Sequence, residues 1–170
     1  MIYINISDKG INLLKTLEGA VKQNGKHMIY DDQTGKAANP NAPLPRGATI
    51  GYGHLIKPGE NFIAGITEAC ATEILRADIA AAERAVQNNI NVPLMQNQYD
   101  ALVIFAYNIG AKNFANSTVV KYINNPHFKS SIYPDLKSAW VAWNKSGGRV
   151  MPGLTRRRTK EWNLFAACHV

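Results

Sequence analysis

The sequence predicts an α+β fold that is mostly helical, with a small sheet confined to the early part of the chain. Apolar residues recur at helical spacing in several separate stretches. In contrast, residues 27–32 (HMIYDD) and 48–56 (ATIGYGHLI) are rich in the β-branched and aromatic residues that are typical of strands. The 170 residues are enough for one domain with a sizeable core. Together these observations indicate one helix, a small hairpin and then five helices.

The first helix is expected to begin after Ser7, a typical N-cap residue. Its apolar stripe has the spacing of one helix face and consists of Ile11, Leu14, Leu17 and Val21. Glu18 lies beside this stripe near the helix end, and Gly25 marks a break. The two strands of the hairpin follow, and Pro58 with Gly59 ends this region.

The next two helices carry the strongest periodic patterns. One is expected to begin after the cap residue Thr67 and to run to about Asn88. The other follows Pro93 and has almost no polar face over residues 101–109, which predicts a buried central helix. Gly110 stands where a C-terminal glycine belongs.

Three shorter helices are expected in the rest of the chain. Ser117 caps the first of them. The second follows Pro134 and is marked by Leu136, Trp140 and Trp143. The third is expected from about Pro152 to Ala166, because proline is favoured at a helix start.

The net charge of +7 is concentrated at the C-terminal end. Residues 121–170 hold nine Lys and Arg residues against Asp135 and Glu161, so residues 1–120 are neutral. This asymmetry predicts a polyanionic partner: nucleic acid, an anionic membrane surface or an anionic cell-wall polymer. No stretch approaches the roughly 18 apolar residues of a membrane span.

Two further observations concern the cellular compartment. The first residues lack the pattern of a secretory signal peptide, so we expect synthesis in the cytoplasm without one. Cys70 and Cys168 lack the spacing of metal ligands and are expected to be reduced thiols. A disulfide that holds the C-terminus is the alternative.

Four polar side chains near the hairpin are candidates for catalysis, namely Glu18, Asp31, Asp32 and Thr49. A glycosidase needs one carboxyl group as general acid and a second as base or nucleophile. The alternative is structural, because a Glu at a helix end is usually solvated and Asp-Asp before Gln-Thr-Gly is common in turns.

The glycines around Tyr52 and the histidine that follows them are open to two interpretations. Gly51 and Gly53 indicate a bulge or the close approach of a ligand. His54 is more typical of a hydrogen-bonded structural imidazole. Because the four histidines do not cluster, no metal site and no cofactor are expected.

Polar residues of the later helices are also open to both interpretations. Asn108 and Asn116 stand at helix ends, where asparagine either caps the helix or presents its amide to a sugar. Arg156, Arg157 and Arg158 form a solvated basic face or contact an anionic polymer. Because consecutive helical residues point in different directions, at least one of them should face inward and pair with an acid.

Taken together, these segments resemble the phage-type lysozymes, glycoside hydrolase family 24. The resemblance covers nearly the whole chain and rests on Glu18-Gly19, Tyr30-Asp31-Asp32 with Gly35, TIGYGH (49–54), QNQYDALVIFAYNIGAKNFANST (96–118) and PGLTRRRTKEWNLF (152–165). It implies a two-lobed lysozyme-like fold with the cleft between a small β-hairpin lobe and a helical C-terminal lobe. The implied small lobe is about 15–66 and the linking helix about 67–93. The helical lobe is about 94–170 plus the start of the N-terminal helix.

The resemblance also implies roles for individual residues. Glu18 matches the family's general acid, Asp32 its second carboxylate, and Thr49 the threonine that holds the attacking water. The remaining matches are the substrate-binding Tyr30, Asn108 and Asn116, the structural His54, and Arg157 at a buried, ion-paired position. Asp31 falls on a less restricted position.

The implied activity is that of a muramidase, which hydrolyses the β-1,4 bond after N-acetylmuramic acid in peptidoglycan with inversion. A lytic transglycosylase needs the acid but no residues that activate water, so Asp32 and Thr49 favour hydrolysis. A non-catalytic wall-binding module would keep the same fold, and a nucleic-acid binder would use the arginine triplet, although no reader motif is present. The protein is expected to be a monomer. It is either a phage endolysin or an antibacterial effector, and an effector would need an immunity protein that inhibits it.

The segment between Asp32 and Thr49 is longer than in the family pattern, with the two residues 17 positions apart. Residues 36–48 therefore look like an insertion in the hairpin turn, and residues 23–26 look like a smaller one. Loop closure makes such insertions inexpensive, and Pro40, Pro43 and Pro45 stiffen this one. We expect the hairpin ends to stay paired and the insertion to contact substrate peptide or an inhibitor. A shifted strand register would bring Asp31 rather than Asp32 to the substrate.

Overall fold

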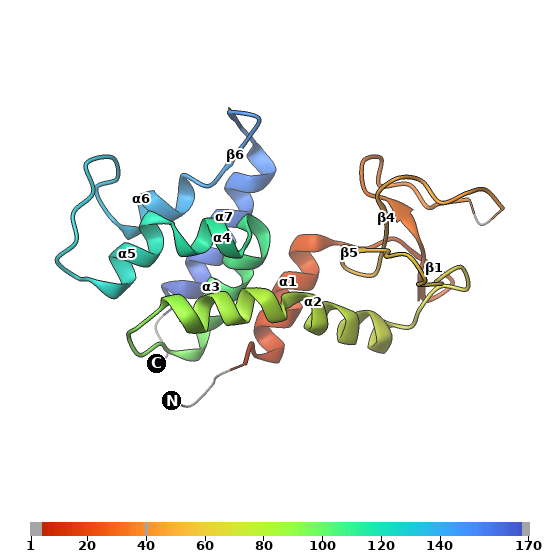
Figure 1. Ribbon diagram of the computed structural model, residues 1–170, viewed down its shortest axis with the longest axis horizontal. Coiled ribbons are helices and arrows are strands. Elements are labelled where there is room, and N and C mark those ends of the chain that lie inside the picture. The colour runs from red at the N-terminus through yellow and green to blue at the C-terminus, as the bar shows by residue number, and fades with distance from the viewer. Residues whose placement is uncertain (1–4, 40, 168–170) are drawn as a thin grey trace. The chain divides into compact units, whose positions relative to one another are not determined.

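The computed structural model describes residues 5–39 and 41–167 and confirms a mostly helical α+β fold (Figure 1). Its helices are α1 Asp8–Glu18, α2 Glu68–Asn89, α3 Gln96–Ile109, α4 Ala111–Ala115, α5 Thr118–Asn124, α6 Leu136–Val141 and α7 Pro152–Phe165. Its strands are β1 Lys22–Gln23, β2 Lys26–His27, β3 Tyr30–Asp31, β4 Ala48–Ile50, β5 His54–Leu55, β6 Lys145–Ser146 and β7 Arg149–Val150. Among the described helices, none is long and apolar enough to cross a membrane.

The chain divides into two compact units, whose boundary falls inside α1 and α2. The hairpin unit is Leu13–Ala80, and the helical unit is Met1–Asn12 with Ala81–Val170. The candidate residues Glu18, Asp32 and Thr49 all belong to the hairpin unit. The site can therefore be described within one unit.

The hairpin unit contains an antiparallel sheet in the order β3-β4-β5. The hairpin ends are paired as predicted, with Tyr30 opposite Thr49 and Asp31 opposite Ala48. The prediction of a single strand over 48–56 is wrong, because the chain reverses between β4 and β5. Gly51 and Gly53 take positive φ angles of 65° and 99°, which glycine adopts without steric cost and which permit this tight turn.

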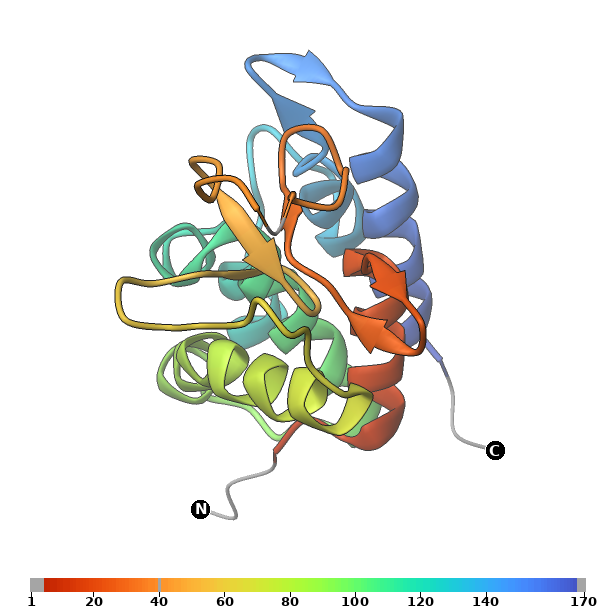
Figure 2. The same cartoon turned by 90° about the vertical axis from the view of Figure 1, so that its right-hand side faces the viewer.

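Two local features differ from the pattern near the start of this unit. The first helix ends at Glu18, so Val21 lies outside it. Gly19 follows with a φ of 69°, a conformation that ends helices. Residues 22–27 then form the β1–β2 hairpin, drawn as paired orange-red arrows in Figure 2. Its turn contains Asn24 and Gly25, both at positive φ, as two-residue hairpin turns require.

The core of the helical unit is built around α3, as the apolar run predicted. Residues 101–106 are at most 1% exposed, and α3 packs against α4 and α7. The ring of Phe105 lies 4.7 Å from that of Trp140 and 6.2 Å from that of Phe114. Aromatic pairs at this spacing add to the stabilisation from burial.

Capping residues set several helix starts, as predicted. Oγ of Ser7 accepts from the backbone N–H of Gly10, Oγ1 of Thr67 from Cys70, and Oγ of Ser117 from Val120. The structure adds the short helix α4 and the β6–β7 hairpin, which the sequence patterns did not predict. Trp143 was expected in the helix after Pro134 but follows the end of α6.

Of the two cysteines, only Cys70 lies within the described residues. Cys70 is a half-buried free thiol at the start of α2. Cys168 lies outside the described residues, as does Pro40 in the insertion.

Candidate active site

Glu18 is the last residue of α1, and its side chain is half-buried. The turn between β4 and β5 lies against it. A Cβ atom at Gly53 would be 3.8 Å from Oε2 of Glu18. Because Gly53 carries no side chain, the space beside this carboxyl group stays open.

Tyr30 lies near both candidate acids, whose charges affect the pKa of its hydroxyl group. Its side chain is buried in β3, and this burial raises the pKa of the Tyr30 hydroxyl. The negative charges of Asp32 and Glu18 raise the pKa further, whereas the backbone N–H of Gly53 opposes the shift. Both carboxyl groups therefore lie close enough to act on one phenol, which stays protonated at neutral pH.

The strand register separates the two neighbouring aspartates. Asp31 is the residue after Tyr30 in β3, so its side chain points to the other side of the sheet. Oδ1 of Asp31 accepts from the backbone N–H groups of Gln33 (2.8 Å) and Thr34 (3.4 Å). Asp31 thus caps the turn. Asp32, in contrast, is exposed, and its charge raises the pKa of Tyr30. This arrangement favours Asp32 over Asp31 as the second carboxylate.

Thr49 is paired directly with Tyr30, so the two side chains share one face of the sheet. Thr49 is 2% exposed, and its hydroxyl group donates to the carbonyl oxygen of Gly47 at 2.9 Å. With its proton used in this way, Oγ1 can still accept a hydrogen bond.

His54 lies between the carboxylates of Asp78 and Glu60. Nδ1 is 2.9 Å from Oδ2 of Asp78, and Nε2 is 3.0 Å from Oε2 of Glu60. Burial of the imidazole opposes its protonation, but the hydrogen bonds to Glu60 and Asp78 outweigh this and raise the pKa of His54. The network ties β5 to α2.

This network should make stability depend on pH. A raised pKa means that the folded protein binds the proton of His54 more tightly than the unfolded chain does. The resulting stabilisation is complete below the ordinary pKa of 6.5 and is lost as pH rises through the folded value. We expect His54→Asn to lower the free energy of unfolding more at about pH 6 than at about pH 9.

Urea unfolding followed by circular dichroism over this pH range measures the difference. The exposed His127 gives a control, because His127→Asn should show no such pH-dependent loss. A His54→Asn deficit that stays constant or grows with pH would mean that the neutral imidazole provides the stabilisation.

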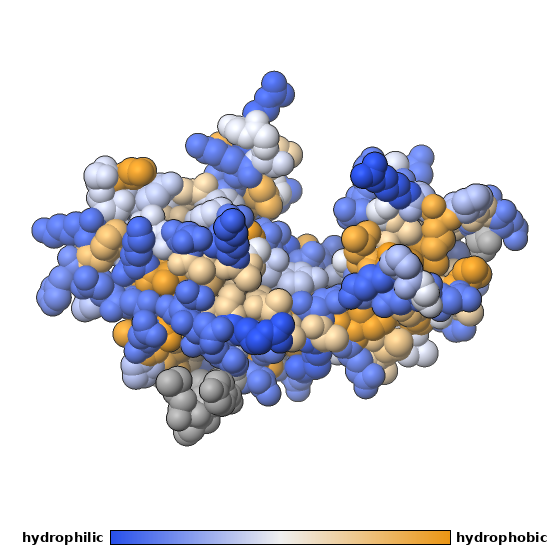
Figure 3. Space-filling view, viewed as in Figure 1, coloured by the Kyte–Doolittle hydropathy of each residue, from blue (hydrophilic) through white to orange (hydrophobic). Residues whose placement is uncertain are grey.

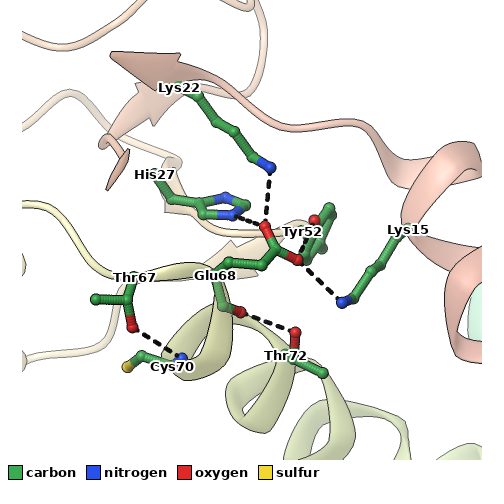
Figure 4. Close-up of polar contacts among 8 residues, drawn as sticks. All are labelled: Lys15, Lys22, His27, Tyr52, Thr67, Glu68, Cys70 and Thr72. Carbon is green, nitrogen blue, oxygen red and sulfur yellow. Dashed lines mark hydrogen bonds and ion pairs between the residues drawn. The ribbon is translucent and has the colours of Figure 1, made fainter. Parts of the chain in front are cut away.

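The carboxylate of Glu68 bonds to several segments around the site (Figure 4). No sequence pattern identified this residue. It accepts hydrogen bonds from Lys15, Lys22, His27 and Tyr52 at 2.7–2.9 Å. Partial burial of Glu68 opposes its ionisation, but these donors outweigh burial and lower the pKa of Glu68 well below its usual range. Lys15 lies in the last turn of α1 and Tyr52 beside Gly53, so Glu68 fixes both segments that meet at Glu18.

The helical unit contains the remaining candidates. Asn108 is exposed at the end of α3, and its Oδ1 accepts a hydrogen bond from Arg158. Asn116 is exposed and donates through Nδ2 to the carbonyl oxygen of Lys112 at 2.9 Å, which is a capping contact. Both amides thus have structural partners, and their proposed contact with substrate stays a prediction.

The burial and ion pair implied for Arg157 are present. Its Nε lies 3.1 Å from Oε1 of the fully buried Glu161. Arg158, which the resemblance did not single out, is also fully buried and lies 3.1 Å from the same oxygen. Since only Arg156 of the triplet is exposed, the triplet itself presents one guanidinium group to a polyanion. Among the residues that the structure describes, no three His, Cys, Asp or Glu side chains could hold a metal ion.

Comparison with known proteins identifies the family of the chain. A sequence model of the phage lysozyme family matches residues 26–161. The endolysin of Bacillus phage B103 is 36% identical over 165 residues, which cover 95% of this chain and 54% of that protein. The endolysin of Salmonella phage P22 is 34% identical over 165 residues and is covered to 98%, with 95% of this chain. The chain thus spans nearly all of the P22 relative but only about half the length of the Bacillus phage endolysins it matches.

Solved structures give the same result. A mutant of P22 lysozyme superposes with a TM-score of 0.73 at 32% identity, covering 96% of this chain and 99% of that one. The muramidase domain of SpmX from Asticaccaulis excentricus superposes with a TM-score of 0.72 at 30% identity, with the same coverage. Because the family match and these likenesses extend over most of its length, the chain belongs to the phage lysozyme family.

Proposed function

We propose that this chain is a peptidoglycan-degrading muramidase that hydrolyses the β-1,4 bond between N-acetylmuramic acid and N-acetylglucosamine. One observation carries the proposal. The negative charges of Glu18 and Asp32 both raise the pKa of the buried Tyr30 hydroxyl, so both acids lie near it. Tyr30 shares a sheet face with Thr49. Two carboxyl groups with a polar residue for water are the groups that glycoside hydrolysis needs.

Each residue has a separate role in the proposed reaction. Glu18, in its protonated form, donates a proton to the leaving glycosidic oxygen. Ionised Asp32 accepts one hydrogen bond from the attacking water, takes that proton as the bond to the anomeric carbon forms, and stabilises the oxocarbenium-like transition state. Because the hydroxyl proton of Thr49 is used by Gly47, Thr49 accepts the other hydrogen of this water. A water that donates both hydrogens has a lone pair directed at the anomeric carbon.

The same roles distinguish hydrolysis from lytic transglycosylation. A transglycosylase forms the new bond within the muramic acid residue and needs no water. Mass spectrometry of the fragments decides between them, because hydrolysis adds the mass of one water and transglycosylation leaves anhydro ends. Fragments with anhydro ends, or binding to peptidoglycan without fragments, would overturn the proposal.

The biological setting is proposed from the relatives. Endolysins of phages are among them, so release to the cell wall at host lysis is one setting. Injection as an antibacterial effector, opposed by an immunity protein, is the other. In both settings the protein would act as a monomer on the cell wall.

The two neighbouring aspartates provide a matched test of the second carboxylate. We expect Asp32→Asn to lower the cleavage rate by about 10²-fold, because the variant cannot stabilise positive charge in the transition state. Asp32 is exposed, so the substitution should change stability by no more than about 0.5 kcal/mol. Release of reducing ends from purified peptidoglycan measures the rate.

Asp31→Asn is the control, because asparagine still accepts the N–H groups of Gln33 and Thr34. It should keep the rate within about threefold of wild type. The opposite ranking of the two variants would assign the second carboxylate to Asp31.

A further inference from the structure

The insertion extends the sheet of the hairpin unit. The backbone N–H of Ala38 donates to the carbonyl oxygen of Ile29 at 2.8 Å, and that of Asp31 donates to Lys36 at 2.9 Å. These bonds flank an antiparallel bridge between Tyr30 and Ala37. The start of the insertion therefore lies along the edge of β3 that β4 does not occupy.

This arrangement leaves an open backbone edge at Ala37. In an antiparallel pair, the N–H and C=O groups between two flanking bonds point away from the partner strand. Within the described residues, neither backbone group of Ala37 forms a hydrogen bond, and the residue is exposed. Such an edge is a template for another extended chain.

A pocket of about 360 Å³ lies beside this edge. Its lining includes Gln23, Met28, Ala37, Asn39, Leu44 and Ile63, and the described lining residues contain no charged side chain. Leu44 and Ile63 are 43% and 53% exposed, so apolar surface is accessible at this pocket. Figure 3 shows that hydrophobic side chains, drawn orange, are present at the surface of the hairpin unit.

The chemistry of the pocket indicates what it binds. The lining residues that the structure describes carry no positive charge that could bind an anionic polymer. A sugar would need several directed polar groups, and one of the two amides is engaged because Oδ1 of Asn39 accepts from Asn41 at 2.9 Å. An open strand edge next to an uncharged pocket is instead the arrangement used for peptides. There the backbone adds as a strand and one side chain enters the pocket.

We propose that the backbone edge at Ala37 and the pocket beside Leu44 and Ile63 form a peptide subsite, which binds the peptide stems attached to the glycan chains of peptidoglycan. The stem pairs with the backbone of Ala37 and places an uncharged side chain between Leu44 and Ile63. This inference rests on the proposed muramidase function for the identity of the peptide. The subsite lies outside the residues that cleave the glycan.

The test uses binding to a protein that does not cut its ligand. In the Glu18→Gln background, the dissociation constant is measured for glycan fragments of one length, with peptide stems and after enzymatic removal of the stems. We expect the stems to tighten binding by about tenfold, the effect of one apolar contact in a pocket. Cleavage of stem-free glycan by the wild-type protein is measured separately and tests the muramidase function alone.

Two variants address the two parts of the subsite. Ile63→Asp places a charge in the pocket, and Ala37→Pro removes the outward N–H, which an edge strand tolerates. Each should abolish the preference for stems and leave binding of stem-free glycan unchanged. Ile132→Asp is the matched control, because Ile132 is 76% exposed in the helical unit and does not line the pocket.

Equal binding of both fragments would overturn the subsite, as would a retained preference in both variants. Each of these results is independent of whether the wild-type protein cleaves stem-free glycan.

Discussion

Replacing Glu18 by glutamine should lower the rate of glycan cleavage by about 10³-fold, within the range that a general acid contributes. Glutamine has the shape of glutamic acid but has no acidic proton for the leaving oxygen. Gly53 leaves the space beside the carboxyl group open, so the substitution causes no steric conflict there. The rate is measured as reducing ends released from purified peptidoglycan.

Glu73 provides the control for this substitution. It is exposed on α2 in the same unit, so Glu73→Gln removes the same charge away from the site. It should keep wild-type activity, and both variants should melt within a few degrees of wild type. A Glu18→Gln protein with more than about a tenth of the wild-type rate would remove Glu18 from the role of general acid.

The parts of the fold that the sequence predicted are those that depend on local interactions. Ser7, Thr67 and Ser117 each cap a helix by accepting a hydrogen bond from the backbone N–H three residues later. Such a cap can be predicted wherever one of these residue types precedes an apolar helical pattern. The apolar run of α3 predicted its burial for the same reason. The ends of the strands were harder to predict from the sequence, because Gly51 and Gly53 make a turn within a segment whose other residues favour strands.

The contacts that hold the site together join residues far apart in the chain, and no local pattern signals them. Glu68 stands in the first turn of α2, where an acid is expected whatever it contacts. Its four donors come from α1, the β1–β2 hairpin and the turn after β4. Likewise, the order of three consecutive arginines does not show that two of them share one buried acid.

Replacing that acid should have the largest effect on stability. Glu161 is fully buried and accepts hydrogen bonds from Trp140 (3.1 Å) and Arg157 (3.1 Å), with Arg158 also at 3.1 Å. Glu161→Gln keeps the shape but removes the negative charge that the two buried guanidinium groups share. We expect the free energy of unfolding to fall by about 3–5 kcal/mol, the cost of breaking a buried ion pair from one side. Because all three tryptophans belong to the helical unit, their fluorescence in urea reports its unfolding.

The cause of the loss can be separated from a simple packing defect. If the excess of buried positive charge is responsible, then removing one of the guanidinium groups as well should restore stability. Glu161→Gln combined with Arg158→Met should therefore cost less than the two single changes together, by about 1–3 kcal/mol. Arg156→Met on the exposed face of α7 should stay within about 0.5 kcal/mol of wild type. Additive losses in the double variant would show that Glu161 stabilises the helical unit through packing and its bond to Trp140 rather than through its charge.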